Sequence, residues 1–95
     1  RQTFIDVTVD IGRDVTLYPG TILQGSTVIG DGAEIGPDTR LVDCAVGAGA
    51  TVEHAVGHDA EVGPRAIVGP YAHLPSGTSV ASDTTTGAFY TAPVG

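Results

Sequence analysis

Aliphatic residues recur at every sixth position along most of this chain of 95 residues. Residues 29–41 hold two copies of one unit, in which an aliphatic residue is followed by Gly, by turn-forming residues and by a small residue. The same unit returns at residues 62–74. A period of six is too short for a domain and is typical of a β-solenoid, in which each unit buries its apolar residue only by stacking on its neighbours.

We call these aliphatic residues the guide positions. The first ones fall six residues apart, at Ile5, Ile11, Leu17, Leu23, Ile29, Ile35 and Leu41. The spacing between guides then becomes irregular, because Val46 follows Leu41 after five residues, Val52 follows after six and Val56 after only four. The count recovers at Val62, Val68, Leu74 and Val80, and Thr86 takes the next guide position. The irregular spacing predicts shortened turns around Cys44 and His54.

The residue four places after each guide is small or β-branched. These residues are Val9, Val15, Thr21, Thr27, Ala33, Thr39, Ala45, Ala50, Ala60, Ala66, Ala72, Thr78 and Thr84. With Ala33 and Ile35 facing inward and Glu34 facing outward, the pattern is the period-2 alternation of a strand. Gly and Pro follow many guides, and both suit sharp bends. Short strands joined by short bends predict a polygonal coil.

A triangle with six-residue sides needs 18 residues for each coil, so the chain would form about five coils, stacked roughly 4.8 Å apart. The expected inward columns are Ile5, Leu23, Leu41, Val56, Leu74; Ile11, Ile29, Val46, Val62, Val80; and Leu17, Ile35, Val52, Val68, Thr86. The expected outward columns are Phe4, Ile22, Arg40, Ala55, His73; Asp10, Val28, Ala45, Glu61, Ser79; and Thr16, Glu34, Thr51, Ile67, Thr85. The first outward column exposes the bulkiest apolar side chains, so we expect it to take part in subunit contact.

The organisation follows from the limits of the repeat. We expect a lead-in or cap at residues 1–4, the repeat β-helix at residues 5–86, and an irregular cap or truncation point at residues 87–95. The start at Arg1 without Met favours a piece of a longer protein.

The net charge is −7, and the chain has no Lys. This balance argues against nucleic acid and anionic membranes as partners, because both need clustered cations. No apolar run approaches the ~20 residues of a membrane span, and no signal-peptide pattern opens the chain. The single Cys44 cannot form an internal disulfide, which fits a reducing cytoplasm.

Candidate chemical groups are scattered. His54, His58 and His73 invite two hypotheses, a zinc site and an acyl-transfer base, but zinc needs converging imidazoles; we interpret them as exposed histidines. Ser26, Ser76, Ser79 and Ser82 lack a base and an orienting group, and we place Cys44 in a turn beside Asp43, which disfavours a thiolate. An ice-binding solenoid would need an unbroken threonine ladder, which Glu34 and Ile67 interrupt. We therefore assign no catalytic, cofactor-binding or metal-binding residue.

Four segments carry a resemblance to a known family: Thr3-Phe4-Ile5-Asp6; Ile11-Gly12-Arg13-Asp14 with Tyr18-Pro19-Gly20-Thr21; residues 23–30, Leu-Gln-Gly-Ser-Thr-Val-Ile-Gly; and residues 68–74, Val-Gly-Pro-Tyr-Ala-His-Leu. The pattern resembles the left-handed parallel β-helix of hexapeptide-repeat acyltransferases. More narrowly, it resembles the first coils of the C-terminal domain of the bacterial bifunctional N-acetylglucosamine-1-phosphate uridyltransferase / glucosamine-1-phosphate acetyltransferase. The left-handed winding is implied by this resemblance and not by the period.

The resemblance implies a role in UDP-N-acetylglucosamine biosynthesis for the cell envelope, in a homotrimer. In the full-length parent, acetyl-CoA would be the cofactor, and sugar phosphate and UTP would be the other small-molecule partners. The uridyltransferase site and the catalytic His of the family would lie outside this chain, which by itself would be an inactive scaffold.

Two departures weaken an active-site interpretation. The family usually has Arg-Pro-Gly-Thr where this chain has Pro75-Ser76-Gly77-Thr78, and that Arg grips the sugar phosphate. The family also places a Lys within a few residues of Gly-Ala-Phe, whereas Tyr90 and Thr91 follow here. A phosphate site without either cation would be poor. The alternative is a separate, natural or engineered, non-catalytic scaffold of hexapeptide repeats.

Overall fold

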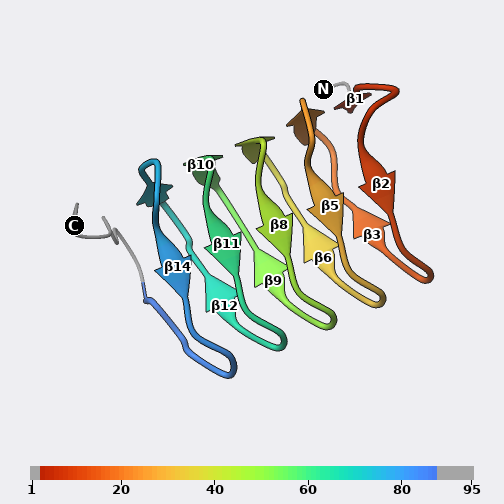
Figure 1. Ribbon diagram of the computed structural model, residues 1–95. Helices are drawn as coiled ribbons and strands as arrows, with labels where there is room; N and C mark the ends of the chain where they lie inside the picture. Colours follow the sequence, from red (N-terminus) through yellow and green to blue (C-terminus); the bar gives the residue numbers. More distant parts are fainter. Residues whose placement is uncertain (1–2, 88–95) are drawn as a thin grey trace.

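The computed structural model describes residues 3–87 and consists there of 14 short strands without a helix. Residues 1–2 of the expected lead-in and residues 88–95 of the expected irregular segment therefore lie outside the described residues, whereas Phe4 of the lead-in belongs to the first strand. Figure 1 shows the strands following one another around stacked coils, with the chain advancing from one end of the stack to the other.

Every third strand belongs to the same parallel sheet, because the chain passes each side of the coil once in every turn. Sheet A holds β1 (Phe4–Ile5), β4 (Ile22–Gln24), β7 (Arg40–Val42), β10 (Ala55–His58) and β13 (Ala72–Leu74). Sheet B holds β2 (Asp10–Ile11), β5 (Val28–Ile29), β8 (Ala45–Val46), β11 (Glu61–Val62) and β14 (Ser79–Val80). Sheet C holds β3 (Thr16–Leu17), β6 (Glu34–Ile35), β9 (Thr51–Val52) and β12 (Ile67–Val68), and a bridge from Ile67 to Thr85 extends it.

We number the coils one to five from the N-terminus and name each corner by the sheets that it joins: AB, BC or CA. The coils are held together by backbone hydrogen bonds that run along the stack. At the edge of sheet B, for example, the Gly12 amide donates to the Ile29 carbonyl over 2.8 Å, and the Gly30 amide donates to the Val46 carbonyl over 2.8 Å. Each coil thus satisfies the polar backbone of the next, which the short strands could not do alone.

The interior is a narrow aliphatic column, filled by the guide residues and by the small residues that precede the strands. Four threonines are also buried there, namely Thr21, Thr27, Thr39 and Thr78. Each hydroxyl donates to a carbonyl of its own corner, as Thr21 does to Tyr18 over 2.6 Å and Thr78 to Pro75 over 2.6 Å. Within the described residues no buried side-chain nitrogen or oxygen lacks a hydrogen-bond partner, so the threonines bring no desolvation penalty.

The predicted inward columns of sheets B and C are confirmed by the strand registers, in which Ile29 pairs with Val46 and Ile35 with Val52. The column of sheet A was predicted wrongly in coil four. Gly57, not Val56, pairs with Leu41 and with Leu74, and Val56 faces outward with 49% of its surface exposed. Ala55, which we expected to face outward, is buried.

The reason for this error lies in where the missing residues fall. Gly57 follows the guide Val52 by five residues and precedes the guide Val62 by five, whereas Val56 as the guide gave spacings of four and six. One residue is therefore missing at the CA corner of His54 and another at the AB corner of Asp59. A second correction concerns coil three. Cys44 is buried with 2% exposure in the inward position that the series of small residues assigned to Ala45, because the AB corner there is one residue short. Ala45 is exposed on sheet B, as its outward column predicted.

Candidate functional site

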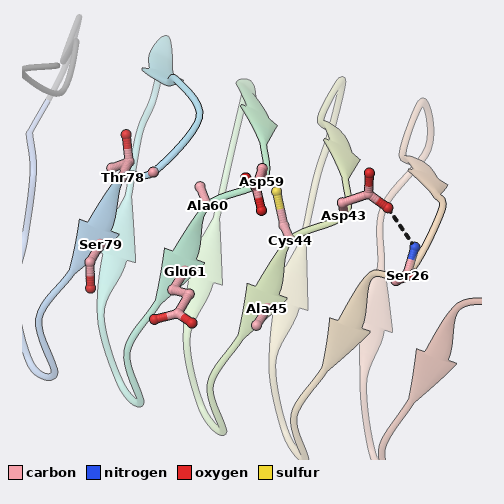
Figure 2. A pocket seen from close by; sticks show the side chains of 10 residues that line it. Ser26, Asp43, Cys44, Ala45, Asp59, Ala60, Glu61, Thr78 and Ser79 are labelled. Carbon is pink, nitrogen blue, oxygen red and sulfur yellow. Dashed lines mark hydrogen bonds between the residues drawn. The ribbon is translucent and has the colours of Figure 1, made fainter. Parts of the chain in front are cut away.

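An open groove of about 390 Å³ runs along the AB corners (Figure 2). In coils two and five the AB corner has three residues between inward positions, as from Leu23 to Thr27. In coils three and four it has only two, as from Leu41 to Cys44. Two short corners stacked between two full ones leave a notch, and we call this groove the notch.

Small side chains form the floor of the notch and carboxylates form its rim. It is lined by Ser26, Asp43, Cys44, Ala45, Asp59, Ala60, Glu61, Gly77, Thr78 and Ser79. Two of the carboxylates are used in the corners themselves. The Ser26 amide donates to Asp43 Oδ1 over 2.8 Å, and Ser76 Oγ donates to Asp59 Oδ2 over 3.0 Å. The notch is therefore acidic, and two of its carboxylates already accept hydrogen bonds from the neighbouring coils.

Cys44 is the one sulfur nucleophile in the chain, and it lies at the floor of the notch. Burial, followed by the nearby charges of Asp43 and Asp59, raises the pKa of the thiol, although hydrogen bonds with the backbone of Ala60 and Val42 act in the opposite direction. The thiol donates to the Val42 carbonyl over 3.3 Å. A buried thiol with a raised pKa is a weak nucleophile at neutral pH, so Cys44 is interpreted as a core residue.

The three histidines do not form a common site. His54 lies at the CA corner, where its ring stacks on Tyr71 with centroids 5.2 Å apart and its Nδ1 is 3.8 Å from Asp38 Oδ2. It is half-buried, whereas we expected it to be exposed. His58 and His73 are exposed on sheet A, as predicted. Among residues 3–87 no group of three His, Cys, Asp or Glu side chains could hold a metal ion.

The arginines of the described segment do not converge on a phosphate-sized site either. Arg65 forms a bidentate pair with Asp83, with nitrogen–oxygen distances of 2.8 and 3.0 Å. Arg40 donates from Nε to Gln24 Oε1 over 3.2 Å. Pro75 stands where the resemblance places a phosphate-gripping Arg, and its carbonyl accepts hydrogen bonds from the amide and the hydroxyl of Thr78. This corner thus serves the fold and offers no cation to a phosphate.

A smaller groove of about 250 Å³ lies on sheet C, and no pattern in the sequence predicted it. Tyr18, Glu34, Thr51 and Glu53 line it together with Gly36 and Pro37. The Tyr18 hydroxyl donates to Glu34 Oε1 over 3.3 Å, and the charge of Glu34 is the main cause that raises the pKa of Tyr18. An ionised phenol is therefore disfavoured at this site. The two residues are 16 positions apart in the sequence and meet only because their coils stack on each other.

No helix of the described residues has the length and apolar character needed to cross a membrane. No protein-family model matches the chain. The chain is nevertheless similar to relatives with the name bifunctional protein GlmU. The relative from Nocardia farcinica is 52% identical over 88 residues, which is 93% of this chain and 18% of that protein. Those from Streptomyces avermitilis and a Geobacillus species are 48% and 41% identical, over 92% and 93% of this chain. The chain spans 18% and 19% of their lengths.

Solved structures show the same fold. GDP-perosamine N-acetyl transferase from Caulobacter crescentus, in a complex of a variant with CoA and GDP-perosamine, matches with a TM-score of 0.92 and 26% identity. That match covers 96% of this chain and 45% of the other. The N-terminal domain of CcmM, in complex with CcmN, matches with a TM-score of 0.85 and 22% identity over 98% of both chains, and shows the fold alone.

The coil geometry and the neighbours together settle the fold class, an all-β, left-handed parallel β-helix of about five coils. The identity of 41–52% over nearly the whole chain is far closer than the shared fold requires. The chain is thus a hexapeptide-repeat β-helix of the GlmU family, and it corresponds to a small part of the GlmU proteins.

Proposed function

We propose that this chain is the β-helix portion of the acetyltransferase domain of a bifunctional enzyme of UDP-N-acetylglucosamine biosynthesis. Within it, these coils serve as a trimerisation scaffold without a complete active site. The full-length parent would transfer the acetyl group of acetyl-CoA to glucosamine-1-phosphate and use UTP at a separate site. The identity to the GlmU proteins carries this proposal. We place the protein in the cytoplasm, where the Cys44 thiol would stay reduced.

The outward column of sheet A supports the scaffold role. After the correction in coil four it consists of Phe4, Ile22, Arg40, Val56 and His73. Phe4 is 51% exposed and Val56 is 49% exposed, so the correction adds an apolar side chain to the middle of the column. Aligned apolar groups on a flat sheet favour contact with another subunit, since exposed apolar patches mark interaction sites. A symmetric oligomer would bury the column on every copy.

Molar mass in solution tests the scaffold role, by light scattering behind size exclusion. We expect a trimer of three chains of 9.6 kDa. Val56→Asp and Ile22→Asp should dissociate it, because each would bury a carboxylate without a partner at the contact. Val28→Asp is the matched control, since Val28 is equally exposed, at 46%, but lies on sheet B. A wild-type monomer, or a trimer that survives Val56→Asp and Ile22→Asp, would contradict the assignment of sheet A.

Acetyl-CoA binding tests the second half of the proposal. This chain should show no binding in titration calorimetry, because the coils with the remaining site residues would be missing. Clear binding by the isolated chain would overturn the scaffold interpretation and indicate an acetyl-CoA site within this chain.

A separate, non-catalytic scaffold is the alternative, and the corner at Pro75 is the observation that favours it. There the hydroxyl of Ser76 bonds the carboxylate of Asp59, so the corner presents an acidic surface where the family resemblance requires a cation. In the complete protein that contains this segment, acetylation of glucosamine-1-phosphate distinguishes the two. If Pro75→Arg raises that activity from a measurable level, the segment belongs to an enzyme; a complete protein inactive in both forms favours the scaffold.

A further inference from the structure

A ring of three copies joins two different surfaces of the chain, because the contacts of a three-membered ring are heterologous. Sheet A, which carries the exposed side chains of Phe4 and Val56, therefore does not meet sheet A of the neighbour. Sheet A borders the AB and the CA corners. Whichever of these corners points to the axis of the ring brings sheet A against the other sheet of that corner, so the partner surface is either sheet B or sheet C.

The AB corner is poorly suited to the axis of a ring. Its short turns in coils three and four expose the carboxylates of Asp43 and Asp59 at the rim of the notch. Three copies would bring these carboxylates together, and neither Lys nor Arg is among the residues that line the notch. Like charges that face one another across a contact repel, so sheet B is disfavoured as the partner of sheet A.

The CA corner has the composition of a contact. Tyr18 and Tyr71 lie there with 40% and 57% of their surfaces exposed, and the ring of Tyr71 stacks on His54. The carboxylate of Asp38, at the same corner, lies 3.8 Å from Nδ1 of His54 in its own chain. Aromatic side chains are enriched at protein–protein contacts. A CA corner at the axis places sheet A of one copy against sheet C of the next and leaves sheet B outside the contact.

Sheet C carries the charges that complement sheet A. Arg40 is exposed at the centre of the outward column of sheet A, and the partner that it has within the chain is neutral, because its Nε donates to Gln24 Oε1 over 3.2 Å. The groove on sheet C has the carboxylates of Glu34 and Glu53, and its lining includes neither Lys nor Arg. A guanidinium with a neutral partner and a pair of carboxylates without a cation are complementary.

The two carboxylates of the groove face the same space. The Tyr18 hydroxyl donates to Glu34 Oε1 over 3.3 Å. The charge of Glu34 and, less strongly, that of Glu53 raise the pKa of Tyr18, so both carboxylates lie near the phenol. A carboxylate accepts several hydrogen bonds, and a guanidinium presents a planar fork of N–H donors that can bond two acceptors at once. The groove therefore suits an arginine side chain that enters from outside.

The heights of these residues along the stack also agree. Copies that bury the whole column of sheet A lie side by side with parallel stacks, and rotation about a parallel axis keeps each residue at its height. Each coil rises by about 4.8 Å. Arg40 follows Glu34 by about one third of a coil and precedes Glu53 by about two thirds of a coil. Arg40 of one copy therefore arrives between the levels of Glu34 and Glu53 of the next.

We propose, on the basis of the trimer of the proposed function, that Arg40 of each copy docks in the sheet C groove of the next copy and bonds the carboxylates of Glu34 and Glu53. A second copy of this chain is thus the occupant of the groove. The pairing also sets the register of the copies, because a slide by one coil in either direction leaves the guanidinium with only one of the two carboxylates.

Charge reversal tests the pair, by light scattering behind size exclusion over a series of concentrations. Arg40→Glu and Glu53→Arg should each raise the concentration at which the trimer dissociates by about tenfold or more, because each places like charges across the contact. The combined variant should assemble at a lower concentration than Arg40→Glu alone. Arg40→Glu with Glu61→Arg is the matched control, since it has the same net charge but carries the new cation on sheet B, and it should stay dissociated. Circular dichroism should show every variant folded.

The outcomes separate this pairing from the scaffold role itself. A wild-type monomer would contradict the trimer of the proposed function and the pairing with it. A wild-type trimer that Arg40→Glu leaves intact would overturn the pairing alone, and so would a rescue by Glu61→Arg as complete as that by Glu53→Arg.

Cross-linking tests the same contact without relying on charge. Chains with Arg40→Cys and chains with Glu53→Cys, mixed at a concentration at which both assemble, should give covalent dimers with a short bis-maleimide that neither gives alone. Cys44 is buried with 2% exposure and is present in every sample. Arg40→Cys mixed with Glu61→Cys is the matched control and should give no linked dimer. Linked dimers from Arg40→Cys alone would overturn the proposal, because sheet A would then meet sheet A.

Discussion

Gly57 faces the interior of sheet A at a point where a larger residue was expected. A Cβ there would lie 3.0 Å from Leu41 Cδ2 and 3.2 Å from Cys44 Sγ, because the short corner of coil three brings Cys44 inward. We predict that Gly57→Val, which restores an aliphatic guide residue, lowers the free energy of unfolding by about 1–3 kcal/mol through overpacking. Urea unfolding followed by circular dichroism measures this loss.

A double-mutant cycle identifies the cause. If Cys44 fills the space, then Gly57→Val should cost less in a Cys44→Ala background than alone, and the two changes should not add. Val28→Ala, at an exposed position on sheet B outside the proposed contact, should stay within about 0.5 kcal/mol and serves as the control. Strict additivity of Gly57→Val and Cys44→Ala would show that the thiol is not the obstacle.

Val56 and Gly57 show where prediction from the sequence ends. Hydrophobicity favours Val56 over Gly57 as the inward residue, and no local signal contradicts that choice. The correct choice depends on the space that Leu41 and Cys44 leave, 16 and 13 residues earlier in the chain. Where the six-residue count is regular, as at Ile29 and Ile35, the inward residues follow from the pattern alone, because every coil has the same shape.

At the scale of the elements, the Arg65–Asp83 pair links the BC corners of coils four and five. It is bidentate but solvent-exposed, with 65% and 61% of the two side chains accessible. The hydrogen bonds from Arg65 lower the pKa of Asp83. The stabilisation is therefore present above the ordinary carboxyl pKa of about 4 and is lost as the pH falls through the lowered value of the folded state.

We predict that Asp83→Asn reduces the amide protection of β14 slightly at neutral pH and low salt. The difference from the wild type should shrink at high salt, because exposed pairs are screened, and should vanish at acidic pH. Asp14→Asn is the control, since Asp14 occupies the same corner position in coil one and has a similar φ of 57°. A difference that is insensitive to salt would mean that the backbone of the corner, and not the ion pair, is responsible.

The notch was only half predictable from the sequence. The short corner at Cys44 was expected from the spacing, but the second one, at Asp59, was hidden by the wrong guide residue in coil four. A notch requires both short corners on the same side of the triangle and in adjacent coils. That coincidence depends on the register of β10 against β7 and β13, which pairs Gly57 with Leu41 and Leu74.

For the whole molecule, the architecture followed from the period, because a repeat that cannot bury its own apolar residue has to stack. The period says nothing about the winding direction, which came from family resemblance. The period also does not predict how much more exposed the guide residues of the first coil are. Ile5 of coil one is 39% exposed, whereas Leu23 and Leu41 in the same column are fully buried. Guide residues at equivalent positions of one column thus differ in burial according to how many coils cover them.

This gradient leads to a prediction about Leu41 and Leu17, two guide leucines at different depths in the stack. Leu41→Ala should lower the free energy of unfolding by about 2–5 kcal/mol, because Leu41 is fully buried with a coil on each side. Leu17→Ala in coil one should cost clearly less, since Leu17 is only half-buried and contacts one neighbouring coil. Hydrogen exchange should show the same order, with slow amides in β4–β12 and faster ones in β1–β3. Equal costs for the two leucines would mean that the first coil is covered in solution, by another copy or by another segment, and the molecule would then have to be treated as part of a longer stack.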